Sequence, residues 1–302
     1  MNMKQRTNSR SFTRRHRHMK IPLLLVALLL LGAFVFYLLA DRPEDTDDAI
    51  QEQTQTLDND EAEDEAPILE LPSVQSELDA VLGTVRGTHS VLVEDPLTGD
   101  VLASHRINET YFTASIYKLY VAYMGLQDIQ SGLYDPNESY NQGRTRMECI
   151  EVMLRDSDSP CPEQMWEEQG RATGNERLAE LGLTNTDLLD ISTTVHDANT
   201  ILERLYAEKD LSEEYAEVLR ENLRDFAERD FRQGLPSAFD EVGDIMVYNK
   251  PGLYDEGWLD AAMIELPNGR TVIVSIFSDN AYYQEVRTIA DAIISPLIEA
   301  SR

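Results

Sequence analysis

The chain has 302 residues, and its 26 Lys and Arg against 55 Asp and Glu give a formal net charge of −29 at pH 7. This charge disfavours binding to nucleic acid, whose phosphates would repel the protein, and is typical of a well-solvated surface. The five His are scattered or lie near the N-terminus, and no Cys/His cluster has the spacing of a zinc site. We therefore expect no metal and no cofactor.

The N-terminal part of the chain consists of three segments of different composition. Residues 1–20 hold seven Lys or Arg and no acid, residues 21–40 form an unbroken apolar run, and residues 41–72 carry thirteen acids and one Arg. An apolar run of this length can span a bilayer, and the basic flank marks its cytoplasmic side. We expect a cytoplasmic leader, a single-pass anchor in the lipid bilayer and a disordered acidic stalk, followed by an extracytoplasmic domain at residues 73–302. Leu38 stands where signal-peptide cleavage needs a small residue, which favours a retained anchor over a cleaved signal.

The domain begins and ends with strand patterns and is helical between them. Short apolar runs bounded by turn residues predict strands at 90–94, 101–105, 244–249, 258–266 and 271–277. Apolar residues at helical spacing predict helices at 113–131, 147–154, 162–171, 175–181, 196–207, 212–226 and 281–300. Thr193 and Thr194 are suitable N-cap residues for the helix that starts at 196. Strands at both ends of a domain predict one antiparallel sheet with a helical insertion.

Three short polar elements follow one another in the domain. They are Ser115-Ile-Tyr-Lys118, Ser157-Asp158-Ser159 and Lys250-Pro251-Gly252. A serine three residues before a lysine on a helix places hydroxyl and amine on one face, where the amine can take the hydroxyl proton. A chain of this length contains roughly one such pair by chance, so the order of all three elements carries the prediction.

With these elements in this order, residues 74–302 resemble the class A β-lactamases and the wider family that includes the penicillin-binding proteins. The family elements are Ser-x-x-Lys, Ser-Asp-Asn and Lys-Thr-Gly, so one element is intact here and two are altered. Residues 231–236 and 260–264 resemble the family as well. The resemblance implies an α/β (α+β) fold of the serine β-lactamase and transpeptidase type, with a five-stranded antiparallel sheet flanked by helices and an all-helical lobe. It also implies a serine hydrolase acting on β-lactams or cell-wall peptides.

The resemblance assigns the catalytic roles. Ser115 is the acylated nucleophile and Lys118 its base. Ser157 passes a proton to the leaving nitrogen, and Asp158 holds its loop together by accepting backbone hydrogen bonds. The N–H groups of Ser115 and Leu253 form the oxyanion hole.

Substrate binding is expected at the two altered elements. Ser159 replaces the family Asn, and its shorter hydroxyl weakens contacts with a substrate amide. Lys250 attracts a substrate carboxylate and supplies the positive charge that lowers the pKa of Lys118. Pro251 replaces the family Thr and removes its hydroxyl, while Gly252 lets the substrate lie against the strand.

The segment 183–194 predicts weak deacylation. Class A enzymes carry a long loop here with a glutamate that activates the deacylating water, and this segment has no room for it. Asp187 and Asp190 are the nearby acids, and we interpret both as turn and capping residues.

Cys149 and Cys161 are the two cysteines of the chain. Both lie in the domain expected outside the membrane, where an oxidising environment permits a disulfide. We predict that they form one around the loop that carries Ser157, with two buried free thiols as the alternative.

Two other functions stay open at this point. A D,D-peptidase needs acylation at Ser115 but no dedicated deacylating glutamate. A non-catalytic protein that binds cell-wall peptides or a partner protein would explain the altered second and third elements. The natural substrate and the oligomeric state do not follow from the sequence.

Overall fold

The computed structural model describes residues 70–228 and 245–302. The predicted leader, the predicted anchor, most of the predicted stalk and the family-like segment 231–236 lie outside these residues. Among the helices that are described, none is both long and apolar enough to cross a membrane.

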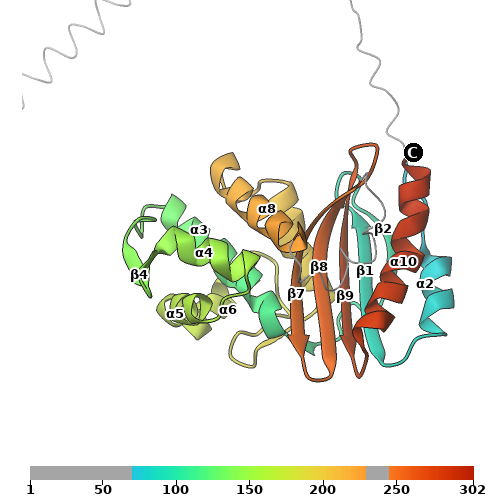
Figure 1. The fold of residues 1–302 in the computed structure, drawn as a ribbon, viewed down its shortest axis with the longest axis horizontal. Helices are drawn as coiled ribbons and strands as arrows, with labels where there is room; N and C mark the ends of the chain where they lie inside the picture. Colours follow the sequence, from blue (N-terminus) through green and yellow to red (C-terminus); the bar gives the residue numbers. More distant parts are fainter. Residues whose placement is uncertain (1–69, 229–244) are drawn as a thin grey trace, which may run out of the picture. The chain divides into compact units, whose positions relative to one another are not determined.

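Five strands form one antiparallel sheet, as predicted, and their order is β2-β1-β9-β8-β7. The strands are β1 (Thr88–Asp95), β2 (Asp100–His105), β7 (Met246–Tyr254), β8 (Gly257–Glu265) and β9 (Thr271–Asp279). β1 pairs with β9 from Thr88 opposite Asp279 to Glu94 opposite Ile273. Central strands of the sheet therefore come from opposite ends of the domain (Figure 1).

Strand β7 is longer than the strand predicted at 244–249, and it includes the Lys-Pro-Gly element that the family resemblance placed on a strand. The expected strand ended at residue 249, before the Lys-Pro-Gly element, whereas β7 continues to Tyr254. Pro251 lies opposite Asp260 of β8. Because β7 is the edge strand, a proline without an N–H can face outward without interrupting the ladder. The third polar element therefore belongs to the sheet edge.

All seven predicted helices are present, with ends shifted by a few residues. They are α3 (Tyr117–Gln130), α4 (Arg146–Arg155), α5 (Pro160–Gln169), α6 (Arg171–Glu180), α7 (Val195–Tyr206), α8 (Glu213–Glu228) and α10 (Tyr283–Ala300). Thr194 caps α7 by accepting a hydrogen bond from the backbone N–H of Asp197, which confirms the predicted cap. The elements that were not predicted are the helix α2 (Gln75–Leu82), the 3-10 turn η1 (Ala114–Ile116), and the short strands β3 (Tyr111–Phe112), β4 (Ser139–Asn141), β5 (Arg144–Thr145) and β6 (Ser192–Thr193).

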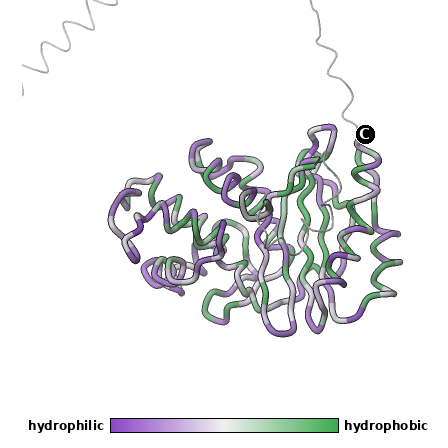
Figure 2. The backbone as a smooth tube through the Cα atoms, in the orientation of Figure 1, coloured by the Kyte–Doolittle hydropathy of each residue, from purple (hydrophilic) through white to green (hydrophobic). Residues whose placement is uncertain are grey.

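The sheet is covered on both faces. α10 and α2 pack together on one face, and α7, α8 and η1 pack on the other (Figure 1). Alternate residues of β9 enter different apolar clusters, with Val274 on the α10 side and Ile273 on the α7 side. Apolar residues therefore concentrate along the strands (Figure 2).

Helix α3 is the centre of the helical lobe formed with α4, α5 and α6 (Figure 1). Nearly all of its side chains are buried, including Tyr120 and Tyr123. A helix that is buried on all sides is held firmly by its neighbours. The residues at its start therefore have a rigid support.

Candidate active site

Ser115 lies where β3 ends and α3 begins. It is the middle residue of η1, which leads directly into α3. Ala114 before it has a φ of 42°, in the left-handed region that residues other than glycine rarely adopt. Strained backbone of this kind persists where its surroundings hold it, and it clusters at functional sites. Ser115 is half-buried and lines a cleft of about 760 Å³, so a ligand can reach it.

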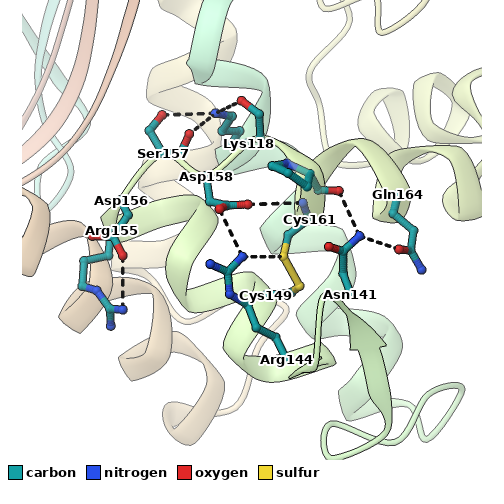
Figure 3. Close-up of polar contacts among 12 residues, drawn as sticks. Lys118, Asn141, Arg144, Cys149, Arg155, Asp156, Ser157, Asp158, Cys161 and Gln164 are labelled. Atoms are coloured by element: carbon teal, nitrogen blue, oxygen red, sulfur yellow. Dashed lines mark hydrogen bonds and ion pairs between the residues drawn. A yellow bond between two sulfur atoms is a disulfide. The ribbon is translucent and has the colours of Figure 1, made fainter.

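Lys118 lies in the first turn of α3, with only 2% of its surface exposed. Its Nζ donates to the Ser157 carbonyl oxygen at 2.5 Å, to Ser157 Oγ at 3.2 Å and to Ser159 Oγ at 3.4 Å (Figure 3). Burial lowers the pKa of Lys118 to about 8, although nearby carboxylates oppose the shift. An amine with such a pKa can act as a general base near neutral pH. Within residues 70–228 and 245–302 there is no hydrogen bond between Lys118 and Ser115, so the amine must turn toward the serine to take its proton.

The Ser157 side chain is hydrogen-bonded to two lysines. Its Oγ accepts hydrogen bonds from Lys118 and, at 3.1 Å, from Lys250 Nζ. Lys250 is fully buried, and burial together with the charge of Lys118 lowers its pKa to about 7, against the attraction of Asp260. Two buried ammonium groups beside one hydroxyl repel each other, so near neutral pH the pair carries less than two full charges. The hydroxyl thus sits between two groups that can each give or take a proton.

The loop that carries Ser157 is tied down on both sides. Asp158 pairs with Arg144 Nη1 at 3.1 Å and accepts a hydrogen bond from the Cys161 N–H at 3.4 Å. A disulfide joins Cys149 of α4 to Cys161 of α5, which confirms the predicted bridge (Figure 3). Ser157 itself has a left-handed φ of 54°. The cross-link and the carboxylate together hold this strained residue against the lysines.

Gly252 allows β7 to lie against η1. A Cβ at this position would come within 3.0 Å of the Thr113 carbonyl oxygen, 3.1 Å of Ile116 and 3.2 Å of Ala114. These contacts are tighter than ordinary packing and one of them is to backbone, so a side chain here requires the strand or the turn that carries Ser115 to shift by a few tenths of an ångström. In this structure, the absence of a side chain at Gly252 serves the contact between strand and turn.

The cleft brings together four of the predicted site residues, Ser115, Lys118, Ser159 and Leu253. Ser157, Lys250 and Gly252 are not part of its lining. Lys250 reaches the site through its hydrogen bond to Ser157, not by facing the cleft directly.

The cleft also has walls that the sequence analysis missed. Its remaining lining residues are Phe112, Ala114, Tyr117, Pro160, Glu163, Gln164, Trp166, Glu167, Arg171 and Ile191. Half of these ten come from α5, and Glu163 and Glu167 follow its N-cap residue Ser159 at intervals of four residues, the spacing of one helix face. That spacing was visible in the sequence, but it does not tell which face of the helix borders the cleft.

Segment 183–194 contributes an apolar group to the cleft. Asp187 accepts hydrogen bonds from Asn175 Nδ2 at 2.7 Å and from the backbone N–H groups of Leu189 and Asp190, and these bonds lower its pKa. Its geometry is therefore that of a turn residue, in agreement with our interpretation. Ile191 lines the cleft instead, and its carbonyl oxygen accepts from the Thr113 N–H at 2.9 Å.

No group of three or more His, Cys, Asp or Glu side chains that could hold a metal ion occurs in the described part of the chain.

Comparisons with known proteins agree with this geometry. The model of the family described as "Beta-lactamase enzyme family" matches residues 73–297. A β-lactamase structure from Burkholderia vietnamiensis is similar, with a TM-score of 0.66 and 17% identity over 75% of this chain and 97% of that one. A β-lactamase structure from Chitinophaga pinensis gives 0.67 and 14% over 76% and 99%, and the structure of PBP-A gives 0.66 and 16% over 75% and 98%. Structural similarity at these identities establishes the fold, and no curated protein matches the sequence.

Proposed function

Because the chain belongs to the β-lactamase enzyme family and has its serine-hydrolase fold, we propose that it forms an acyl-enzyme at Ser115 with a β-lactam or a cell-wall peptide. The family membership confirms the resemblance seen in the sequence. The roles of the individual residues, the location at the membrane and the slow release of product are parts of this proposal.

The observation that carries the proposal is the arrangement around Ser157 Oγ. This hydroxyl lies within hydrogen-bond distance of both lysine amines, one of which belongs to the same helical turn as the cleft serine. In the proposed acylation, Lys118 takes the proton of Ser115 as its oxygen attacks the carbonyl carbon. Ser157 then delivers a proton to the leaving nitrogen, and Lys118 or Lys250 replaces it.

The oxyanion that forms during this attack needs donors on the cleft side. We assign them to the backbone N–H groups of Ser115 and Leu253, both of which line the cleft. The close packing of β7 on η1 at Gly252 keeps these two residues together.

Release of the acyl group is proposed to be slow. Segment 183–194 presents Ile191 to the cleft, and Asp187 is engaged in its own turn. Without a fixed base, the attacking water loses assistance that is typically worth 10²- to 10⁴-fold in rate.

The protein is proposed to be a single-pass membrane protein with its enzyme domain on the extracytoplasmic side. Support comes from the apolar run at 21–40 and its basic N-terminal flank. The disulfide between Cys149 and Cys161 is consistent with an oxidising compartment.

A D,D-peptidase is the second candidate. The same observation on segment 183–194 favours it, because a peptidase can pass the acyl group on from Ser115 without a glutamate of that segment. The two candidates share the acylation step and differ in the substrate that is turned over.

The test is covalent labelling of the full-length protein with a fluorescent penicillin. We expect label on Ser115 in the wild type and none in Ser115→Ala, with peptide mapping to locate the adduct. Hydrolysis of the penicillin and cleavage of a D-Ala-D-Ala peptide, measured side by side, then separate the two candidates. A folded wild-type protein that takes no label would overturn the proposal and favour a non-catalytic binding protein.

A further inference from the structure

Helix α5 places carboxylates in the wall of the cleft. Glu163 and Glu167 lie one turn apart on this helix, one and two turns after Ser159, and all three line the cleft with Ser115. The acylation chemistry described above uses neither carboxylate. Because they line the same cleft as Ser115, we ask what they can do in another step.

The polar side chains of this wall differ in how they are engaged. Glu167 Oε1 accepts two hydrogen bonds from Arg171, at 2.6 Å and 3.1 Å. Gln164 Oε1 accepts from Asn141 Nδ2 at 2.7 Å. The Glu163 carboxylate makes no hydrogen bond and no ion pair to any residue of the described ranges, and the residue is exposed, whereas its backbone N–H donates to the Ser159 carbonyl oxygen at 3.4 Å. Its oxygens are therefore open to water in the cleft.

Glu163 also acts on the site electrostatically. Its negative charge opposes the burial that lowers the pKa of Lys118, and it adds to the burial that raises the pKa of Tyr117 to about 12. Tyr117 and Lys118 both line the cleft and follow Ser115 within one helical turn. The carboxylate is therefore within electrostatic reach of the group that activates the serine.

We propose that Glu163 is the general base that activates water for release of the acyl group from Ser115. This inference rests on the proposed function, because it requires an acyl-enzyme. The carboxylate takes a proton from water while the water oxygen bonds to the acyl carbon. The bond from that carbon to Ser115 Oγ then breaks, and the proton passes from Glu163 to Ser115 Oγ. Free enzyme and a carboxylic acid are regenerated.

The position of Glu163 also fits the slow release of the acyl group proposed above. A side chain on an exposed helix face with no partner samples several rotamers, and only some of them place the carboxylate beside the acyl carbon. A base that is not held in position gives less acceleration than one fixed by its neighbours.

The experiment measures the two half-reactions separately in the full-length chain. A fluorescent penicillin labels the protein, excess reagent is removed, and intact-protein mass spectrometry follows loss of the adduct with time. Glu163→Gln keeps the size of the side chain and removes the base. We expect release to slow about 10- to 100-fold, the lower part of the range for general-base catalysis because the group is exposed.

Acylation should respond differently in the same variant. Removing the negative charge of Glu163 disfavours the ammonium form of Lys118, so the pKa of Lys118 falls and the pH midpoint of acylation moves down. A residue that only tunes Lys118 would shift this midpoint and leave the release rate as it is in the wild type.

Glu167→Gln is the matched comparison, since it removes a carboxylate from the same wall one turn along. We expect its effect on release to be at least about fivefold smaller, because Glu167 is held by Arg171.

Added formate should speed release in Glu163→Ala by supplying a carboxylate in the vacated space. If Glu163→Gln loses its adduct at the same rate as the wild type, the role of Glu163 is overturned while the proposed function stands. A wild type that forms no adduct overturns the proposed function and this inference together.

Discussion

The loop that carries Ser157 and the segment 183–194 contribute to the same cleft, through Ser159 and Ile191, but they are built differently. The first is held by a disulfide, by the Asp158 to Arg144 ion pair and by two buried lysines. Among the described residues, the second is held without a cross-link or an ion pair to a buried lysine, by hydrogen bonds within its own turn, by hydrogen bonds to Asn175 of α6 and Asp197 of α7, and by the pairing of β6 with β3.

This difference fits the proposal that acylation and release depend on different parts of the cleft. Of the groups proposed for acylation, the two lysines are buried and both are hydrogen-bonded to Ser157, whose loop is cross-linked, while Ser115 lies half-buried in the cleft. The segment where the family carries its deacylating glutamate presents an aliphatic side chain. A fold can therefore keep a rigid acylation site while the chemistry of release is lost or moves to another element.

The largest effect is expected from Lys118→Met. A serine hydroxyl must lose its proton to attack, and Lys118 is the amine one helical turn from Ser115. We expect labelling by a fluorescent penicillin to fall at least about 10³-fold. Circular dichroism and thermal melting should show a folded protein, and Lys209→Met, at an exposed lysine, serves as the control. Labelling at the wild-type rate would mean that another group is the base.

The second largest effect is expected for release of the acyl group, where segment 183–194 offers no base. After mixing with excess β-lactam, the wild-type protein should accumulate the Ser115 adduct and show a burst of one equivalent followed by slow turnover. Without a fixed base, release should be slower by about 10²- to 10⁴-fold than with one. Asp187→Asn should leave the lifetime of the adduct within about twofold of the wild type, since its carboxylate faces its own turn. Rapid turnover without a detectable adduct would contradict the proposal that the acyl group is released slowly.

A third prediction uses pH. Acylation needs neutral Lys118, and burial lowers its pKa from 10.5 to about 8. Below this pH the amine is mostly protonated, so the acylation rate should fall about tenfold for each pH unit and should level off above it. Labelling rates between pH 6 and pH 10 measure the midpoint. A midpoint near the ordinary lysine value would mean that the amine is not the base or that it is exposed in solution.

The smallest expected effect on chemistry comes from the paired variant Cys149→Ser/Cys161→Ser. Loss of the cross-link between α4 and α5 should lower the free energy of unfolding by about 3 kcal/mol. Urea denaturation followed by circular dichroism checks this value. Labelling of Ser115 should slow only a few-fold at low temperature, because Asp158 still holds the loop. Unchanged stability would show that the other contacts of the loop suffice.

The sequence predicted those features whose signal is local. The serine and lysine of the first element share one helix turn, and the periodic apolar residues after them predict α3 whatever surrounds it. Strand alternation likewise predicts four of the five strands of the sheet close to their observed ends. The two-residue strands β3 and β6 are too short to give any periodicity, so their pairing could not be foreseen.

Features that depend on packing were not predictable. Lys250 was predicted to lie near Lys118, but its complete burial and its hydrogen bond to Ser157, a residue 93 positions earlier in the chain, could not be read from the sequence. Glu163 was part of a predicted helix, yet only the packing of α5 against α3 and α4 decides which face borders the cleft. The apolar pattern that predicted a strand at 244–249 stops before Lys250, whereas β7 continues to Tyr254 along the sheet edge, where Pro251 is tolerated.

The pairing of β1 with β9 has a consequence for how the protein is made. Thr88 lies opposite Asp279, so the middle of the sheet stays open until the last part of the domain has been synthesised. Contacts this distant in sequence form slowly, because a long loop must close first. The helical lobe, whose contacts are more local, can form earlier. A chain that ends before β9 lacks the partner of two central strands and exposes their edges to aggregation and proteolysis.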